Sequence, residues 1–323
     1  MKILIVAAPL NEDISATPQR YGGVGRTFYL LAKNNPNITI ASNWEALRDC
    51  DISVSRKIIL SEEEERKIVE NGDLQGWDNN FDLIFHAQPN RHYVSNKPTL
   101  VWAPGYGETI NRLNTNILCH NLKNQHPYIS NLMTNLYEFV LGVDIPPFQE
   151  YKKDDFILQV TNHYPQINSI ILAKLCLKHN IKCIFAGPIS DGYPLSDYID
   201  NEYTFYEGVI PEERKIELLK KARFFGCLYS HPINDPPLSA KQALSYGCPI
   251  LTNQIGAMAE FIDGSNGYFI RNEQDFIDAW QRRHEFNQLD CYDSVKNKYS
   301  VDNMIKTFNN VCERIINEAN GNI

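Results

Sequence analysis

Three glycines in four positions stand before an apolar segment of helical period near the start of the chain. The segment reads RYGGVGRTFYLLAK, and the glycines are Gly22, Gly23 and Gly25. A helix that begins there directs backbone N–H groups and the positive end of its dipole outward, and glycine lets an anion come close. The alternative is a tight turn that needs positive φ. The pattern by itself leaves both interpretations open.

Two common nucleotide-binding motifs are absent from this sequence. The first apolar run ends near Ala8, and the glycines begin only at Gly22, so no G-x-G-x-x-G directly follows the first strand. No G-x-x-x-x-G-K-[ST] occurs either. The spacing therefore excludes a dinucleotide fingerprint and a phosphate-binding loop of the nucleotidase kind.

The bulk composition predicts a soluble protein of two domains. The chain has 323 residues, a net charge of −8 and no long basic run, which disfavours a large nucleic-acid footprint. Eight cysteines are scattered without C-x-x-C or zinc spacing, so we expect reduced thiols, a cytoplasmic location and no metal. No apolar run is long enough to span a bilayer, so we expect no stable membrane insertion.

The first half of the chain alternates strands and helices. Continuous apolar runs predict buried parallel strands at KILIVAAPL, ITIAS, FDLIFHA and TLVWAP. Val24, Phe28 and Leu31 form one face of the helix after the glycines. Further helices are expected around Ser61–Asn71 and Pro127–Leu136.

The second half repeats this alternation. Strands are expected at FILQVT, CIFAG, YTFYEGV, FFGCLYS and PILTNQ, with helices near Ile170–His179, Pro211–Ala222 and Leu238–Tyr246. Gly247, followed by Pro249, is a good stop for the last of these helices. A final helix carries an apolar stripe that must dock on another element. The stripe consists of Met304, Phe308, Val311 and Ile315.

These elements predict an α/β protein with two Rossmann-like parallel-sheet domains facing a cleft. Two prolines and a charged stretch in VDIPPFQEYKKDDF mark the domain boundary. We assign residues 1–148 to the first domain, 149–300 to the second and 301–323 to the terminal helix. Sheets of this kind bind ligands at the carboxyl ends of their strands.

The segment from Glu207 to Ile270 resembles the donor-binding half of glycosyltransferase family 4, whose members have the GT-B fold. It contains EGVIPEERKIELLKKA, CLYS and ALSYGCPILTNQIGAMAEFIDGSNGYFI. LGVDIPPF is similar to the segment that joins the two domains, and YGGVGRTFYLLA to the N-terminal glycine loop. The resemblance implies that the terminal helix packs back across the domain junction.

The resemblance assigns a donor site to the second domain. Members of the family usually carry two glutamates eight residues apart, the first at the donor sugar and the second at the ribose. Here the matching positions are Asn234 and Gln242, with Asp235 as a neighbouring carboxylate. An amide still binds hydroxyl groups, but it lacks the charge that stabilises an oxocarbenium ion. Leu238 and Ser239 fall where backbone N–H groups meet the diphosphate. The structural alternative for the two amides is a loop cap and a solvated helix residue.

The sequence departs from the family at the usual Arg and Lys of the diphosphate clamp. The matching positions are Asn162 and Ile167, and an isoleucine cannot pair with phosphate. The resemblance also places Val209 beside the donor, and Gly22, Gly23 and Gly25 on its far side. Other cations could replace the clamp, namely Arg20, Arg26, His163 and Lys241. Pro104 stands where relatives often have a histidine near the sugar, and His86 is a further candidate.

The resemblance implies a retaining, metal-independent glycosyltransferase. Its donor is a nucleotide sugar, UDP- or GDP-linked, and it needs no cofactor. Asn234 and Asp235 are the predicted catalytic residues, and Gly22, Gly23, Gly25, Arg26, Asn162, Val209, Leu238, Ser239 and Gln242 the predicted donor-binding residues. The acceptor stays open among a glycan, a protein, a lipid-linked sugar and a modified nucleic acid.

Three alternatives remain open at this point. A binding protein that kept the GT-B fold and lost turnover would also lack the carboxylates and the cations. A transferase that modifies DNA or a base would share the donor site. A sugar-nucleotide epimerase would need acid/base carboxylates that the sequence does not show.

Overall fold

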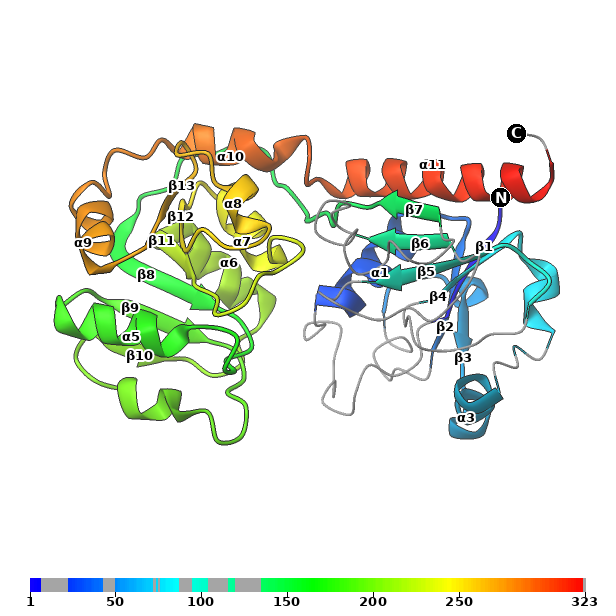
Figure 1. Ribbon diagram of the computed structural model, residues 1–323, viewed down its shortest axis with the longest axis horizontal. Helices are drawn as coiled ribbons and strands as arrows, with labels where there is room; N and C mark the ends of the chain where they lie inside the picture. Colours follow the sequence, from blue (N-terminus) through cyan, green and yellow to red (C-terminus); the bar gives the residue numbers. More distant parts are fainter. Residues whose placement is uncertain are drawn as a thin grey trace. The chain divides into compact units, whose positions relative to one another are not determined.

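The structure is a computed structural model that describes residues 1–6, 23–42, 50–71, 74, 76–86, 95–103, 116–119 and 135–321. The chain divides into two compact units. Unit 1 comprises Met1–Gly142 with Val301–Ile323, and unit 2 comprises Val143–Ser300 (Figure 1). The roles assigned above to residues 1–148, 149–300 and 301–323 stay predictions, and each unit is described by itself.

Unit 1 is built on a parallel sheet, which has seven strands within the described residues, in the order β3-β2-β1-β4-β5-β6-β7. The order reverses between β1 and β4, which makes that pair the topological switch point of the sheet. The strands are β1 (Ile3–Val6), β2 (Ile38–Ser42), β3 (Lys57–Ile59), β4 (Leu83–His86), β5 (Thr99–Ala103), β6 (Asn116–Cys119) and β7 (Asn135–Glu138).

The four strands expected in this half are confirmed as β1, β2, β4 and β5, and three others were missed. The helix expected at Pro127–Leu136 is wrong at its end, because Leu136 lies on β7; residues 127–134 lie outside the described residues. β3 and β7 lie at the two edges of the sheet, and apart from the buried Tyr137 of β7 they carry half-buried or exposed side chains. Such short, mixed strands lack the continuous apolar run that reveals a central strand.

The helices of unit 1 pack their apolar faces on this sheet. As expected, Phe28 of α1 is buried, and its ring makes edge contacts to Phe85 and Trp102 at centroid distances of 5.6 and 5.0 Å. Ser61 and Glu64 form a reciprocal capping box at the start of α3. The helical elements are α1 (Gly23–Asn34), η2 (Val54–Arg56), α3 (Glu62–Asn71), η3 (Trp77–Asn80) and α11 (Val301–Ala319).

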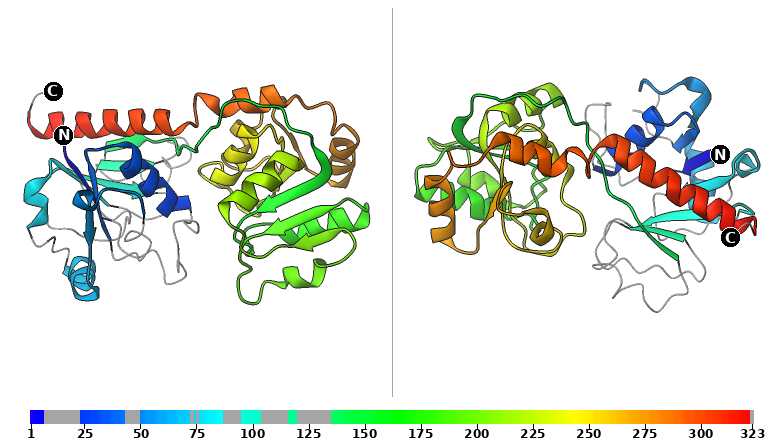
Figure 2. Two further views of the ribbon diagram at one scale, coloured as in Figure 1. Left: turned by 180° about the vertical axis from the view of Figure 1, so that it is seen from behind. Right: turned by 90° about the horizontal axis from the view of Figure 1, so that it is seen from above.

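The terminal helix α11 belongs to unit 1 and runs along it beside α1 (Figure 2). Its predicted stripe is buried, as expected. The ring of Phe308 lies 5.3 Å from that of Phe85 and 5.9 Å from that of Phe139. Met304 accepts a hydrogen bond at its sulfur from the Gly142 N–H. The terminal helix thus packs in the same core as the sheet and α1 of unit 1.

Unit 2 repeats the same plan. Its parallel sheet has the order β10-β9-β8-β11-β12-β13, and its switch point lies between β8 and β11. The strands are β8 (Asp154–Val160), β9 (Cys183–Ala186), β10 (Thr204–Tyr206), β11 (Ala222–Cys227), β12 (Ile250–Thr252) and β13 (Gly267–Phe269).

The helices of unit 2 follow the predicted alternation. An apolar cluster that includes Leu172, Phe185, Phe224 and Phe276 joins the sheet to α5 and α9. The helical elements are α5 (Ser169–Lys178), η4 (Pro194–Tyr198), α6 (Glu212–Lys221), α7 (Leu238–Ser245), α8 (Met258–Phe261), α9 (Glu273–Gln281) and α10 (Gln288–Lys296).

The predicted stop of α7 at Gly247 is confirmed. Gly247 has φ of 63°, a left-handed conformation that only glycine adopts without strain. Its N–H donates to the Leu244 carbonyl, and the Cys248 N–H donates to that of Ala243, both at 2.9 Å. These two bonds form a Schellman motif. The motif fixes where α7 ends.

We predict that Phe308→Ala destabilises unit 1 by about 3–5 kcal/mol, because the variant leaves a cavity among fully buried rings. Denaturant unfolding, followed by circular dichroism and fluorescence, measures this change. Asn310→Ala, an exposed substitution on the same helix, is the matched control and should change the unfolding free energy by less than about 0.5 kcal/mol. Equal effects of the two variants would show that α11 does not dock through Phe308.

Candidate functional site in unit 2

The candidate site lies at the switch point of unit 2, where the loops after β8 and β11 lie side by side. Ile167, in the loop after β8, forms an isolated antiparallel bridge with Tyr229, in the loop after β11. The Ser230 N–H donates to the Gln166 carbonyl at 3.0 Å. These contacts hold the two loops together at the carboxyl edge of the sheet, which is where open α/β sheets bind ligands.

The loop after β11 leads into the N-terminus of α7 through two prolines. Pro237 has extended backbone dihedrals and accepts hydrogen bonds from Ala240 and Lys241 at its carbonyl. Among the described residues, no side chain caps this helix. The backbone N–H groups of Leu238 and Ser239 precede the first intrahelical donors, so they present two polar hydrogens and the positive end of the dipole to the loop.

Asn234 is a buried amide whose hydrogen-bonding groups are not satisfied. Its side chain is 5% exposed, and neither Oδ1 nor Nδ2 has a partner among the described residues. Each such buried group costs about 1–3 kcal/mol. Gln159 on β8 shares the feature, but it faces the same side of the sheet as Ile157 of the apolar cluster. Asn234 instead lies in the irregular loop four residues before α7.

Asp235 is engaged in an ion pair inside unit 2. Its carboxylate pairs with the ammonium of Lys241, which has no exposed surface. The same ammonium lies 4.8 Å from the ring centroid of Tyr299. Burial lowers the pKa of Lys241, while the neighbouring Asp235 carboxylate opposes that shift. Lys241 is therefore not the phosphate-binding cation considered above, because its charge is already matched by Asp235.

Gln242 lies one turn after Leu238 on the same face of α7. It is 4% exposed, so the interpretation as a solvated helix residue is wrong. Its Nε2 donates to Glu212 Oε1 at 2.8 Å, and the other oxygen of Glu212 pairs with Lys215. Glu212 was not predicted from the sequence, because thirty residues separate it from Gln242 and no spacing rule connects them.

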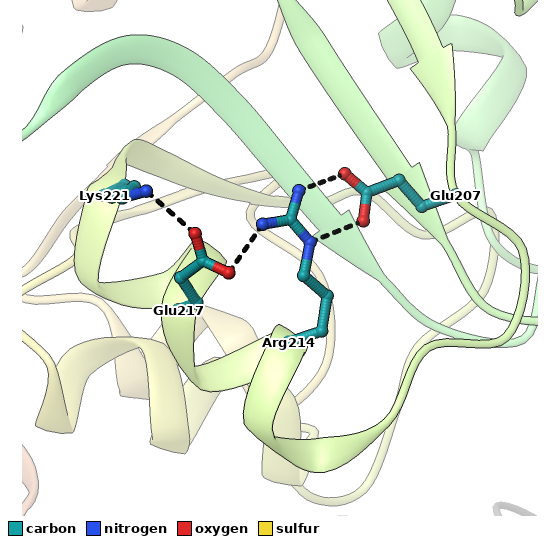
Figure 3. A network of polar contacts seen from close by, with 4 residues as sticks. All are labelled: Glu207, Arg214, Glu217 and Lys221. Carbon is teal, nitrogen blue, oxygen red and sulfur yellow. Dashed lines mark hydrogen bonds and ion pairs between the residues drawn. The ribbon is translucent and has the colours of Figure 1, made fainter.

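The loop after β10 is held against α6 by a bidentate ion pair (Figure 3). Arg214 donates to both carboxylate oxygens of Glu207, at 2.9 and 2.6 Å, and to Glu217 at 2.7 Å. Glu207 first and Glu217 second raise the pKa of Arg214. Lys221 and Arg214 lower the pKa of Glu217 to about 2. The ion pair of Glu207 and Arg214 spans the loop that carries Val209, whose side chain is half exposed.

The loop after β8, where the family resemblance predicts a diphosphate-binding Arg and Lys, offers no cation at these positions. Asn162 is exposed two residues after the end of β8, and Ile167 is 5% exposed. His163 is fully buried: Nδ1 bonds to the Ser169 hydroxyl at 2.8 Å and Nε2 to the Ala186 carbonyl at 3.2 Å. Burial lowers its pKa to about 4, against the opposing effect of the Ala186 bond. An uncharged, enclosed imidazole cannot replace the missing phosphate cation, so that candidate is wrong.

Of the predicted residues of unit 1 that the structure describes, His86 lies at the switch point of this unit, and Gly23, Gly25 and Arg26 lie in the first turn of α1. Gly23 begins α1 and Gly25 is buried in the first turn, while Arg26 is half-buried there. His86 ends β4, the neighbour of β1, and has no exposed surface. Gly22, like Arg20 and Pro104, lies outside the described residues.

Two further findings concern the described part of the chain. No group of three or more His, Cys, Asp or Glu side chains there is arranged to hold a metal ion. No helix among the described residues combines the length and the apolar composition needed to cross a bilayer.

Solved structures that match this chain over nearly its whole length include two glycosyltransferases. HepE of Anabaena, solved with UDP-glucose, is 12% identical and matches over 98% of this chain and 99% of that chain, with a TM-score of 0.71. A glycosyltransferase from Rickettsia africae is 15% identical over 98% of both chains, with a TM-score of 0.70. AviGT4, a glycosyltransferase involved in avilamycin A biosynthesis, is 14% identical over 98% of both chains, with a TM-score of 0.69.

No protein-family model and no curated protein matches the sequence. The structural likeness extends over nearly the whole chain, and two parallel-sheet α/β domains define its architecture. The chain therefore has the GT-B fold of glycosyltransferases, as the sequence predicted.

We predict that His163 makes unit 2 less stable in mild acid. The unfolded chain takes up a proton near pH 6.5, whereas folded His163 takes one only near pH 4. The contribution of neutral His163 is complete above about pH 6.5 and is lost at up to about 1.4 kcal/mol per pH unit as the pH falls toward 4.

His163→Gln removes this titration. Urea unfolding at several pH values between 7 and 4 gives the free energy of unfolding as a function of pH. The slope of this curve should be smaller for the variant by the equivalent of up to one proton, because all other titrating groups are common to both proteins. Parallel curves would mean that His163 is protonated equally well in the folded state.

Proposed function

We propose that this protein is a glycosyltransferase that binds a nucleotide sugar in unit 2, at the N-terminus of α7. The observation that carries the proposal is the juxtaposition of an uncapped helix start with a buried, unpartnered amide at the switch point of the sheet. Two backbone donors suit an anion, and an unsatisfied amide suits sugar hydroxyl groups.

The parts of the donor follow the order of the residues along α7. Leu238 and Ser239 hold the diphosphate through their backbone N–H groups, and Gln242, one turn further, holds the ribose. Asn234, before the helix, faces the transferred sugar. Val209, on the loop after β10, and Asn162, after β8, also line the proposed donor site. The support for each assignment is its position at one edge of one sheet.

The proposed chemistry relies on dipoles in place of ionised side chains. The bond between the anomeric carbon and the diphosphate oxygen breaks, and the helix N-terminus stabilises the charge that develops on the diphosphate. The acceptor oxygen bonds to the anomeric carbon on the face that the diphosphate leaves, and its proton passes to the leaving diphosphate. The step therefore retains the configuration and needs neither a metal nor a cofactor. Asp235, neutralised by Lys241, fixes the loop so that Asn234 meets the sugar.

We further propose that unit 1 binds the acceptor; Gly22, Gly23, Gly25 and Arg26 stay predicted donor-binding residues. The acceptor class stays open among a glycan, a protein, a lipid-linked sugar and a modified nucleic acid. UDP-linked donors have support from HepE, solved with UDP-glucose, and from the Staphylococcus aureus protein TarM, solved with UDP. GDP-linked donors are the other group to be tested.

Donor binding should raise the melting temperature. A ligand at a hundred times its dissociation constant stabilises a protein by about 2.7 kcal/mol, which corresponds to a few degrees for domains of this size. A panel of UDP- and GDP-linked sugars, followed by differential scanning fluorimetry, should contain at least one such ligand. Gln242→Ala should abolish the shift. Gln281→Ala, an exposed amide on α9, is the matched control and should preserve it. A panel with no effect would overturn the donor assignment.

Asn234 should affect turnover more than nucleotide binding. If its amide contacts the transferred sugar, Asn234→Ala should lower kcat for donor hydrolysis at least about tenfold while leaving the dissociation constant of the free nucleoside diphosphate within about twofold. Release of nucleotide from the donor, measured by a coupled assay, gives the first quantity, and calorimetry gives the second. Donor binding without any turnover in the unmodified protein would instead support a binding protein that lost catalysis.

A further inference from the structure

The contact between Gln242 and Glu212 has only one chemically consistent orientation. An ionised carboxylate accepts hydrogen bonds and cannot donate them, whereas a glutamine amide has a donor end and an acceptor end. The side-chain end of Gln242 that lies 2.8 Å from Glu212 Oε1 must therefore be the NH2 group. Consequently the amide oxygen of Gln242 faces away from Glu212.

Glu212 is itself held in place on α6. Its second carboxylate oxygen pairs with Lys215, one turn along the helix. Both side chains are largely buried, with 22% and 16% of their surface exposed. The start of α6 is also tied to the preceding loop by the bidentate pair of Glu207 and Arg214 (Figure 3). Glu212 is thus a fixed acceptor and not a mobile surface carboxylate.

We propose that Glu212 is a positioning residue for the donor: it fixes the amide of Gln242 so that the oxygen accepts hydrogen bonds from the ribose hydroxyls. The inference rests on the proposed function, in which Gln242 lies about 6 Å beyond the diphosphate along α7, four residues at about 1.5 Å each. That separation corresponds to the step from a diphosphate to its ribose. Glu212 need not touch the nucleotide to act in this way.

The same contact accounts for an amide at position 242. A carboxylate there would lie within hydrogen-bond distance of the Glu212 carboxylate, and two like charges so close repel each other strongly in a buried site. Glutamine at 242 and glutamate at 212 are therefore a matched pair. The identity of one residue determines which identity of the other is compatible with binding.

The experiment compares ribose recognition in four proteins. The unmodified protein, Glu212→Gln, Gln242→Glu and the exchanged double variant are titrated by calorimetry with UDP and GDP. Each is also titrated with the 2′-deoxy and 3′-deoxy forms of the nucleotide that the unmodified protein binds more tightly. Removing a ribose hydroxyl should weaken binding to the unmodified protein about five- to tenfold.

We call the loss of affinity caused by removing a ribose hydroxyl the deoxy penalty. In Glu212→Gln the amide of Gln242 can bond to residue 212 in two equivalent orientations, so its oxygen no longer faces the ribose in every molecule. The deoxy penalty should therefore fall to about threefold or less. Gln242→Glu should bind the complete nucleotide at least about tenfold more weakly. The exchanged variant should recover affinity relative to Gln242→Glu and regain the deoxy penalty, because the amide introduced at position 212 can donate to the carboxylate introduced at position 242.

Glu213→Gln is the matched control, since it removes the same charge from an exposed position in the first turn of α6. This variant should show the same deoxy penalty as the unmodified protein. If the protein binds neither nucleotide, the proposed function and this inference both fall. If it binds one of them but the penalty is unchanged by Glu212→Gln, or the exchange restores nothing, only the role of Glu212 is refuted. A thermal melt of each variant separates loss of recognition from loss of folding, because a purely structural contact would change stability without changing the deoxy penalty.

Discussion

The arrangement at the end of β11 depends on which of its buried polar side chains have a hydrogen-bond or ion-pair partner. Asp235 is neutralised by Lys241, and Gln242 is oriented by Glu212. Asn234 lies one residue from the first pair and has no partner for either end of its amide among the described residues. A buried amide that is left unsatisfied while both neighbouring groups are satisfied is costly to retain. A ligand with hydroxyl groups would offset that cost, and this asymmetry is the physical basis of the proposed sugar site.

The electrostatic character of the site follows from the same pairing. The charges of Lys241 and Asp235 cancel, His163 is uncharged because of its burial, and Ile167 contributes no charge. What remains at the loop is the N-terminus of α7, whose backbone hydrogens and dipole attract an anion without a full positive charge. A site of this kind depends on the accurate placement of helix ends. The Schellman motif at Gly247 and the two prolines before Leu238 fix both ends of α7.

Much of the fold was predictable from local pattern. Buried central strands such as Ile3–Val6 and Ile38–Ser42 are continuous apolar runs, and the stripe of α11 repeats at the helical period. The edge strands β3 and β7 were missed, because an edge strand is defined by its place in the sheet and not by a strong pattern of its own. Part of the site was also predictable: Asn234, Leu238 and Gln242 come from one short segment, and the structure places that segment at the switch point of unit 2.

The sequence by itself determined the two α/β halves, the stop of α7 at Gly247 and the absence of a cation at residue 167, since each depends on residue type and near-neighbour spacing. Only the tertiary structure decided which side chains meet across long separations. It paired Gln242 with Glu212, bonded the buried His163 to the Ala186 carbonyl and placed α11 on the core of unit 1. The reason is physical: a contact between residues far apart in the chain is fixed by the packing of whole elements, and no local rule of period or propensity encodes it.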